Sequence, residues 1–190
     1  MTDESFGAEP ISYGDWGHDF FRTAVTEARL LGAVRQLAGR PIEFGPLGVG
    51  PGRLAKVMAR GQVGDPTCAT VDGDKIAFRL AIPAHVEFDL DLQVNKQHYT
   101  VDMVIPVTVT AHAMPGLKIF IDAQPPDRRD LEVKVEAHGF RATVVSIAAD
   151  VEGELRKFVA KYVAREIQKP EIMQARVIDV AGRIDGAWRS

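Results

Sequence analysis

Several features that identify common classes of protein are missing from this sequence. It contains a single cysteine, Cys68, so neither an internal disulfide framework nor a cysteine-rich zinc site can form, and the chain suits a reducing compartment. No stretch approaches the roughly 20 consecutive apolar residues that cross a bilayer. The first ten residues, MTDESFGAEP, are acidic and polar, unlike a signal peptide. We therefore expect a cytoplasmic protein.

An excess of positive charge is also missing. The 23 Lys and Arg residues are outnumbered by 26 Asp and Glu residues, and the net charge at pH 7 is -3. The basic residues are scattered among acids, whereas a nucleic-acid-binding surface needs a broad positive field for phosphate backbones. The sequence therefore predicts no nucleic-acid partner.

Catalytic motifs are missing as well. Neither G-x-S-x-G nor H-E-x-x-H occurs, and neither Cys68 nor Ser146 has a neighbouring histidine in the sequence. Gly48, Gly50 and Gly52 resemble a phosphate-cradling loop, but they have neither the glycine spacing of a dinucleotide loop nor the Lys-Ser/Thr pair of a P-loop. We expect a plain turn there, no enzymatic activity and no cofactor.

The composition is that of a single soluble domain. With 190 residues, of which 46% are hydrophobic and 26% charged, the chain is long enough for one well-filled core. The pattern along the chain predicts a loose N-terminal arm at residues 1–17, one domain at residues 18–170 and an amphipathic extension at residues 171–190.

The first periodic segment predicts a helix. From Asp19 to about Gly39, apolar residues recur at steps of three or four, as on one face of an amphipathic helix. The next segment, residues 40–68, contains Gly and Pro too often for a long regular element. Within it we expect only a short strand or a helical turn at residues 54–60.

From Lys75 to Val144 apolar residues alternate with polar ones, which predicts strands with one buried face. Short turns separate the runs, so consecutive strands should pair as an antiparallel meander. One run, residues 97–112, greatly exceeds the usual strand length and predicts a strongly bent or coiled sheet. Pro83 interrupts a run, and Pro106 marks an edge or the bend itself.

The helical period returns after the strands. A bulge at Gly139 and a last short strand at residues 140–144 lead into an apolar stripe from residue 147 to residue 167, along which acids precede bases as a helix dipole favours. A last amphipathic piece covers residues 177–188. The sequence thus predicts an α+β fold with an N-terminal amphipathic helix, a long, strongly twisted antiparallel meander and a long C-terminal helix.

The stretch HVEFDLDLQV, residues 85–94, carries Glu87, Asp89 and Asp91 at alternate positions. Such side chains lie roughly 6.5 to 7 Å apart at their bases along a strand, which is wide for three carboxylates to share one cation. His85 and His98 could add nitrogen ligands if the register brought them across from one another. A half-exposed strand needs polar residues on its wet side, so we favour a solvated face and predict no metal site.

The apolar side of these strands has two interpretations. If the long helix packs directly on the sheet, its residues form an ordinary core; if a curved sheet holds the helix away, they line a groove suited to an acyl chain. The pattern does not choose between them. The candidate ligand-binding residues are Val86, Phe88, Leu90, Leu92, Tyr99, Val101, Met103, Ile105, Leu155, Phe158 and Tyr162.

One segment carries a resemblance to a known family. The amphipathic helix, the coiled meander and then LEVKVEAHGFRATVVSIAADVEGELRKFVAKYVAREI, in which a strand continues through Gly139 into a helix, resemble the tubular lipid-binding superfamily. The similar region runs from about Phe20 to Ile167. In that family a highly twisted sheet wraps a long helix into a tube whose seam holds lipid chains, without catalytic residues. The resemblance implies lipid binding or transfer, transient membrane contact, and head-to-head or side-by-side homodimers.

Three functions stay open at this point. The first is non-enzymatic binding of a lipid or another hydrophobic small molecule between the sheet and the helix at residues 147–167. The second is a helix-grip fold with cyclase or dehydratase activity, in which Tyr99 or Tyr162 would supply the polar group of the cavity. The third is a structural or assembly protein whose partner surface is the terminal helix with Trp188. We favour the first.

Overall fold

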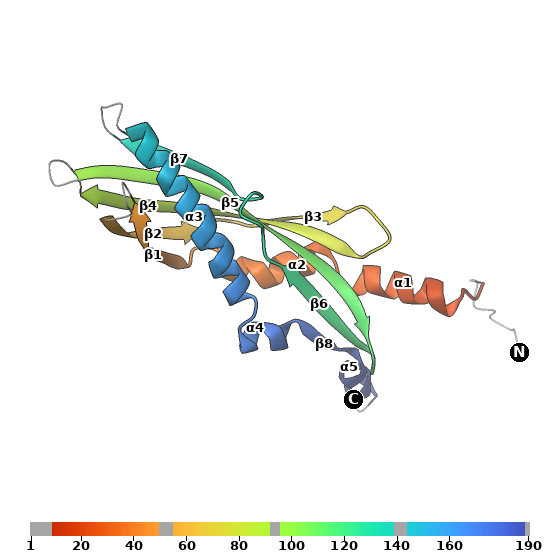
Figure 1. The fold of residues 1–190 in the computed structure, drawn as a ribbon. Helices are drawn as coiled ribbons and strands as arrows, with labels where there is room; N and C mark the ends of the chain where they lie inside the picture. The colour runs from red at the N-terminus through yellow and green to blue at the C-terminus, as the bar shows by residue number, and fades with distance from the viewer. Residues whose placement is uncertain (1–8, 50–54, 92–95, 139–143, 189–190) are drawn as a thin grey trace, which may run out of the picture.

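A computed structural model describes residues 9–49, 55–91, 96–138 and 144–188 of the chain. It shows one strongly curled antiparallel sheet of eight strands together with several helices (Figure 1). The α+β class and the antiparallel sheet predicted from the sequence are therefore confirmed.

Two long neighbouring strands form the spine of the sheet. The strands are β1 (Pro41–Val49), β2 (Ala55–Val63), β3 (Thr67–Val71), β4 (Ala77–Asp91), β5 (Lys96–Met114), β6 (Lys118–Gln124), β7 (Glu132–His138) and β8 (Val177–Asp179). Their order across the sheet is β1-β2-β4-β5-β6-β8, with β3 also beside β4 and β7 also beside β5. β4 has 15 residues and β5 has 19, so both are long enough to take two partner strands in succession on their outer edges.

Two prolines lie where the long strands change partners. β5 pairs first with β7 and then with β6, and residues 105–107 fall between the two paired segments. Pro106 lies there, so its missing N–H group costs no ladder bond. Pro83 has the same position on β4, because β3 pairs with residues 77–81 and β2 pairs with residues 84–87. The expectation that Pro83 interrupts a strand is therefore wrong, whereas Pro106 does mark an edge.

The Gly- and Pro-rich segment before β3 is more regular than its composition indicates. β1 and β2 form an antiparallel hairpin whose register shifts between Phe44 and Leu47. A Cβ atom on Gly61 would collide with the backbone carbonyl oxygen of His85, so this glycine lets β2 and β4 approach each other. Residues 55–60 of the short element expected at 54–60 belong to the longer β2, and residue 54 lies outside the described residues.

The helices of the described residues are α1 (Tyr13–Ala24), α2 (Glu27–Val34), the 3₁₀ turn η1 (Arg35–Leu37), α3 (Val144–Glu166), α4 (Pro170–Ala175) and α5 (Val180–Ala187). The single N-terminal helix predicted from the sequence is in fact two helices, α1 and α2. α1 begins inside the segment expected to be a loose arm, where the Ser12 hydroxyl accepts a hydrogen bond from the N–H of Asp15. Val25 is extended and buried between α1 and α2, and Thr26 caps α2. The apolar spacing continues across this break, so the pattern does not disclose it.

The C-terminal part of the chain also differs from the expectation. α3, with 23 residues, covers most of the stripe predicted to be helical, but it is not the last element. The piece expected at residues 177–188 divides into β8, which extends the sheet beside β6, and the short helix α5. Arg176, just before β8, pairs with Asp122 of β6 at 2.9 Å and lies over the ring of Phe120 at 4.8 Å, which anchors these elements. Of the turn expected at Gly48, Gly50 and Gly52, Gly48 lies in β1 and the other two glycines lie outside the described residues. The strand expected at residues 140–144 also lies outside them, except for Val144, which begins α3.

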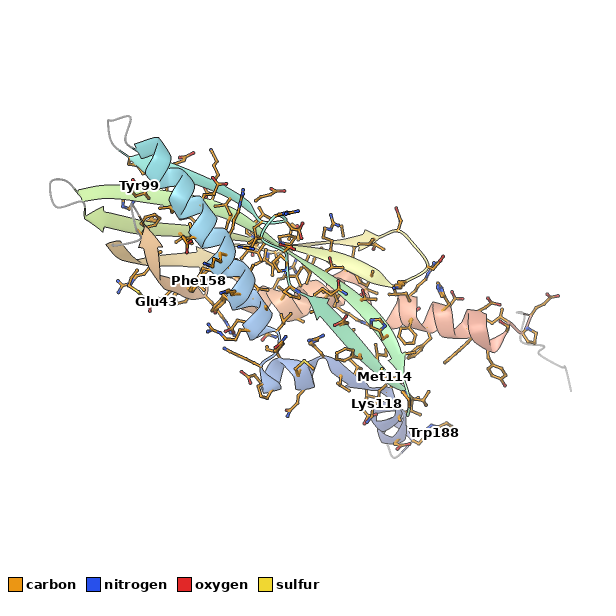
Figure 2. The ribbon with its side chains drawn as sticks, viewed as in Figure 1. Glu43, Tyr99, Met114, Lys118, Phe158 and Trp188 are labelled. Carbon is orange, nitrogen blue, oxygen red and sulfur yellow. The ribbon has the colours of Figure 1, made fainter. Side chains whose placement is uncertain are left out.

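The core consists of two clusters, and the partly buried Leu30, Cys68 and Ile121 pack against both. The larger cluster, called the main core below, unites the inner rows of β4 and β5 with Val151, Leu155 and Val159 of α3. A smaller cluster around Val25, Phe78 and Ile119 packs α1 against the other end of the spine. Figure 2 shows Tyr99 and Phe158 at the α3 end of the molecule, far from Met114, Lys118 and Trp188. The α3 end therefore has its own interior.

Candidate functional site

The main core contains nearly all of the candidate ligand-binding residues that the structure describes. Seven of these residues are buried: Val86, Phe88, Tyr99, Val101, Met103, Ile105 and Leu155. Phe158 and Tyr162 of α3 are half-buried, and their rings stack with centroids 6.2 Å apart. Leu90 lies in β4, but its side chain and the whole of Leu92 are outside the described part. The alternation along β4 and β5 thus places the predicted residues on one inner face.

α3 crosses this inner face, and its backbone lies mainly near the strands at the two margins. Its main backbone contacts are with β1 and β7, while β2, β4 and β5 lie between these strands in the sheet (Figure 1). Side chains from α3 and from the central strands fill the space between them. The helix therefore has neighbours at both margins of the curled sheet.

The main core contains the hydroxyl group of Tyr99. Tyr99 is fully buried, and its ring stacks on Phe88 of the facing strand at 5.0 Å between centroids. Its hydroxyl has no hydrogen-bond partner in the described part of the chain. Burial also raises the pKa of this phenol, which keeps it protonated and able to donate. An unsatisfied buried hydroxyl costs about 1 to 3 kcal/mol of stability, so a partner for it would be favourable.

The outer face of the same strands holds the acids and histidines. His85 Nδ1 lies 2.7 Å from Asp102 Oδ1 and its Nε2 lies 3.3 Å from Glu87 Oε1. His98 Nδ1 lies 2.9 Å from Asp89 Oδ1. The hydrogen bond to Asp102 is the main reason that the pKa of His85 is raised.

The register explains why these acids do not gather at one point. It places His85 opposite Asp102 and Asp89 opposite His98, so carboxylates and imidazoles alternate across β4 and β5. The two histidines do not face each other, and the partner of His98 on β7 is His138, with ring centroids 5.7 Å apart. Among the described residues, no three His, Cys, Asp or Glu side chains are grouped so as to hold a metal ion.

The list of candidate residues based on the sequence omitted several residues of this interior. Val133 and Val135 of β7 pack against the main core, as do the buried Val151 and Val159 of α3. The sequence carries a signal for both pairs. The first two residues belong to the alternating run LEVKV, and the last two flank Leu155 at steps of four, on the same helix face.

Comparisons of the chain with protein-family models, with curated proteins and with solved structures found no match. None of the described helices combines the length and the apolar character needed to cross a membrane. The function must therefore be inferred from the site itself.

Proposed function

We propose that the protein binds a hydrophobic ligand, a lipid acyl chain, between the inner face of β4 and β5 and the helix α3, without catalysing a reaction. The observation that carries this proposal is the position of α3, whose backbone approaches the marginal strands β1 and β7 over a face of buried apolar side chains. In this proposal the sheet wraps around α3, as in the tubular lipid-binding superfamily, and the ligand enters along a margin.

The insertion of an acyl chain between α3 and the sheet is energetically feasible. A chain that slides beneath α3 would replace contacts among Met103, Ile105 and Leu155 with contacts to its own methylene groups. Each buried methylene contributes about 0.8 kcal/mol, so a chain of roughly ten carbons could offset several kcal/mol spent on separating the helix from the sheet. Met103 suits this role because its unbranched side chain can adapt its shape.

Tyr99 supports a ligand with a polar end. Its hydroxyl is buried and has no partner within the described residues, although it can donate one hydrogen bond. A carboxylate, ester or hydroxyl oxygen at the end of an acyl chain would satisfy it. A purely hydrocarbon ligand would leave the hydroxyl unsatisfied, so the proposal favours amphiphilic lipids.

Native mass spectrometry of the purified protein, before and after denaturation, tests the proposal most directly. We expect a bound species of acyl-chain mass that denaturation releases. Saturable binding of a fluorescent fatty acid to delipidated protein should accompany it. If the folded protein has a clean mass and gives no saturable fluorescence change, the proposal is wrong.

Two tryptophan variants on β7 locate the binding. Val135 is half-buried and faces the main core, whereas Lys134, the next residue, points to the outer face. Val135→Trp should block the margin between β7 and α3 and weaken fatty-acid binding at least several-fold. Lys134→Trp adds the same bulk on the other face and should leave the affinity unchanged. Equal losses in two folded variants would place the ligand elsewhere.

A further inference from the structure

A cleft with strong positive charge lies outside the apolar interior, between α3 and the connection from β6 to β7. It consists of two adjoining hollows of about 640 and 530 Å³, which share Asp127 and Arg128 in their walls. The cationic side chains among the residues that line it are Arg128, Arg129, Arg156, Lys157 and Lys161, and the carboxylate among them is Asp127. Asp130 of the same turn and Glu152, which pairs with Arg156, lie beside these residues. The cations therefore outnumber the acids in and beside the cleft, although the net charge of the whole chain is -3.

One wall of the cleft is a well-defined turn. The N–H of Asp130 donates to the carbonyl of Asp127 at 3.0 Å, and the Asp130 carboxylate accepts from the N–H of Asp127 at 3.1 Å. Arg128 and Arg129 occupy the two central positions of this turn and are exposed. Buried residues on either side, Pro126 and Leu131, hold the turn in place. The two guanidinium groups are therefore attached to an ordered backbone.

The other wall is the outward side of α3. Lys157 and Lys161 are four residues apart, so they lie on one face of the helix. Gly153 lines the same cleft, and a Cβ atom there would meet nothing within 4 Å. A glycine inside a helix costs about 0.5 to 1 kcal/mol relative to alanine, and packing does not explain it here. Its absent side chain leaves the floor of the cleft open.

The cations of the cleft are poorly neutralised by the protein. No ion pair joins Arg128, Arg129, Lys157 or Lys161 to an acid in the described part of the chain, whereas Lys134 and Lys169 have such pairs. Arg156 binds Glu152 through Nη2 at 2.7 Å. Its Nε, however, is buried and has no partner among the described residues. The cleft thus offers an excess of positive charge.

We propose that this cleft binds a phosphate group. Guanidinium groups match phosphate oxygens in paired hydrogen bonds, and ammonium groups add point charges. Arg128 opposite Lys157 and Lys161 in the larger hollow, with Arg129 and Arg156 in the adjoining one, therefore forms a suitable cradle. The phosphate belongs to a lipid headgroup or to a soluble phosphate compound. The inference does not depend on the apolar interior, although a lipid with its phosphate in the cleft and a chain under α3 would satisfy both sites.

The test uses the full-length protein and inorganic phosphate, followed by amide NMR shifts. Two double variants remove cations from opposite walls: Arg128→Gln with Arg129→Gln, and Lys157→Gln with Lys161→Gln. A control with the same change of charge is Arg79→Gln with Lys118→Gln, two exposed cations outside the cleft. Figure 2 shows Lys118 at the end of the molecule opposite α3. In the original protein we expect saturable shifts at residues 127–130 and 153–164. The phosphate affinity obtained from these shifts should fall at least about tenfold in both cleft variants and stay unchanged in the control.

A second arm identifies the source of the phosphate. The same proteins are sedimented with phosphatidylcholine vesicles that contain or lack phosphatidic acid. Sedimentation that needs phosphatidic acid and is lost in both cleft variants assigns the site to a lipid headgroup, whereas phosphate binding without sedimentation assigns it to a soluble compound. Absence of saturable shifts, or equal weakening in the control, overturns the proposal. The cleft variants should still bind the fluorescent fatty acid, so this site and the apolar site can fail separately.

Discussion

The two faces of β4 and β5 differ completely although their residues alternate one by one. On the inner face Tyr99 and Val101 are 0% exposed, whereas the side chain of Asp102, the next residue, is 64% exposed and pairs with His85. The outer face carries the residues that usually indicate chemistry, namely acids and histidines, yet they neutralise one another across the strands. The inner face has almost no polar atoms, and the one that it buries, the Tyr99 hydroxyl, has no partner among the described residues. In this sheet the apolar inner face is therefore the better candidate for a functional site.

The largest effect that separates the two faces should come from truncating an inner side chain. Met103→Ala removes a side chain that is 3% exposed from the main core and should lower the free energy of unfolding by about 2 to 5 kcal/mol. Asp102→Ala, on the outer face, should lower it by less than about 1 kcal/mol, because it breaks only an exposed pair. Urea denaturation of both variants measures the difference. Similar losses would mean that the outer face contributes to stability as much as the inner one.

A smaller effect of opposite sign should follow from removing the buried hydroxyl of Tyr99 from the inner face. Tyr99→Phe deletes a hydroxyl that has no partner in the described part of the chain, so the ligand-free protein should gain about 1 kcal/mol of stability. The same variant should bind the fluorescent fatty acid more weakly, because the ligand loses a hydrogen-bond donor.

Tyr13→Phe provides the control for this substitution, since Tyr13 is 97% exposed. Neither the unfolding free energy nor the fatty-acid affinity should change in it. A loss of stability in Tyr99→Phe would show that the hydroxyl already has a partner in the protein, and it would remove the polar contact from the proposed site.

Most of the sheet could be predicted from the sequence because its strands have one solvent-exposed face and one buried face. The alternation from residue 75 onwards correctly indicated strands in these regions, the antiparallel pairing of β5 with β4 and β6, and the unusual length of β5. The predicted meander is wrong at β7, which pairs with β5 instead of its predecessor β6, and the two strands expected on either side of Pro83 are the single strand β4. The Gly- and Pro-rich hairpin of β1 and β2 could not be predicted, since it depends on the close approach of Gly61 to β4. Likewise, the break at Val25 depends on burial against Phe78 and Ile119, which are distant in the sequence.

The candidate site could be predicted in part for the same reason. Periodicity identifies which residues share a face, so Tyr99, Met103 and Leu155 were correctly expected to lie together on the inner side. Periodicity does not measure how far a helix lies from a sheet, and thus it could not decide between a core and a groove. The basic cleft was missed because its two walls, residues 127–129 and residues 153–164, meet only in the folded chain.

The smallest expected effect is a pH dependence of stability, which should arise from the outer face and not from the inner one. The folded protein raises the pKa of His85, mainly through its hydrogen bond with Asp102, so protonated His85 stabilises the fold. This contribution is fully present below the unfolded pKa of about 6.5 and is lost as the pH rises through the higher folded value. Since the side chain is 51% exposed, solvent screening limits the effect to a fraction of a kcal/mol.

The comparison of the original protein with His85→Gln measures this contribution. Their difference in unfolding free energy should decrease between about pH 5 and pH 8 and should shrink further in high salt, because both changes weaken an exposed ion pair. The loss caused by Met103→Ala should hardly change over the same range, since no charge is involved. A difference for His85→Gln that stays constant or grows with pH would contradict the pairing with Asp102 and would leave the outer face without its main electrostatic contact.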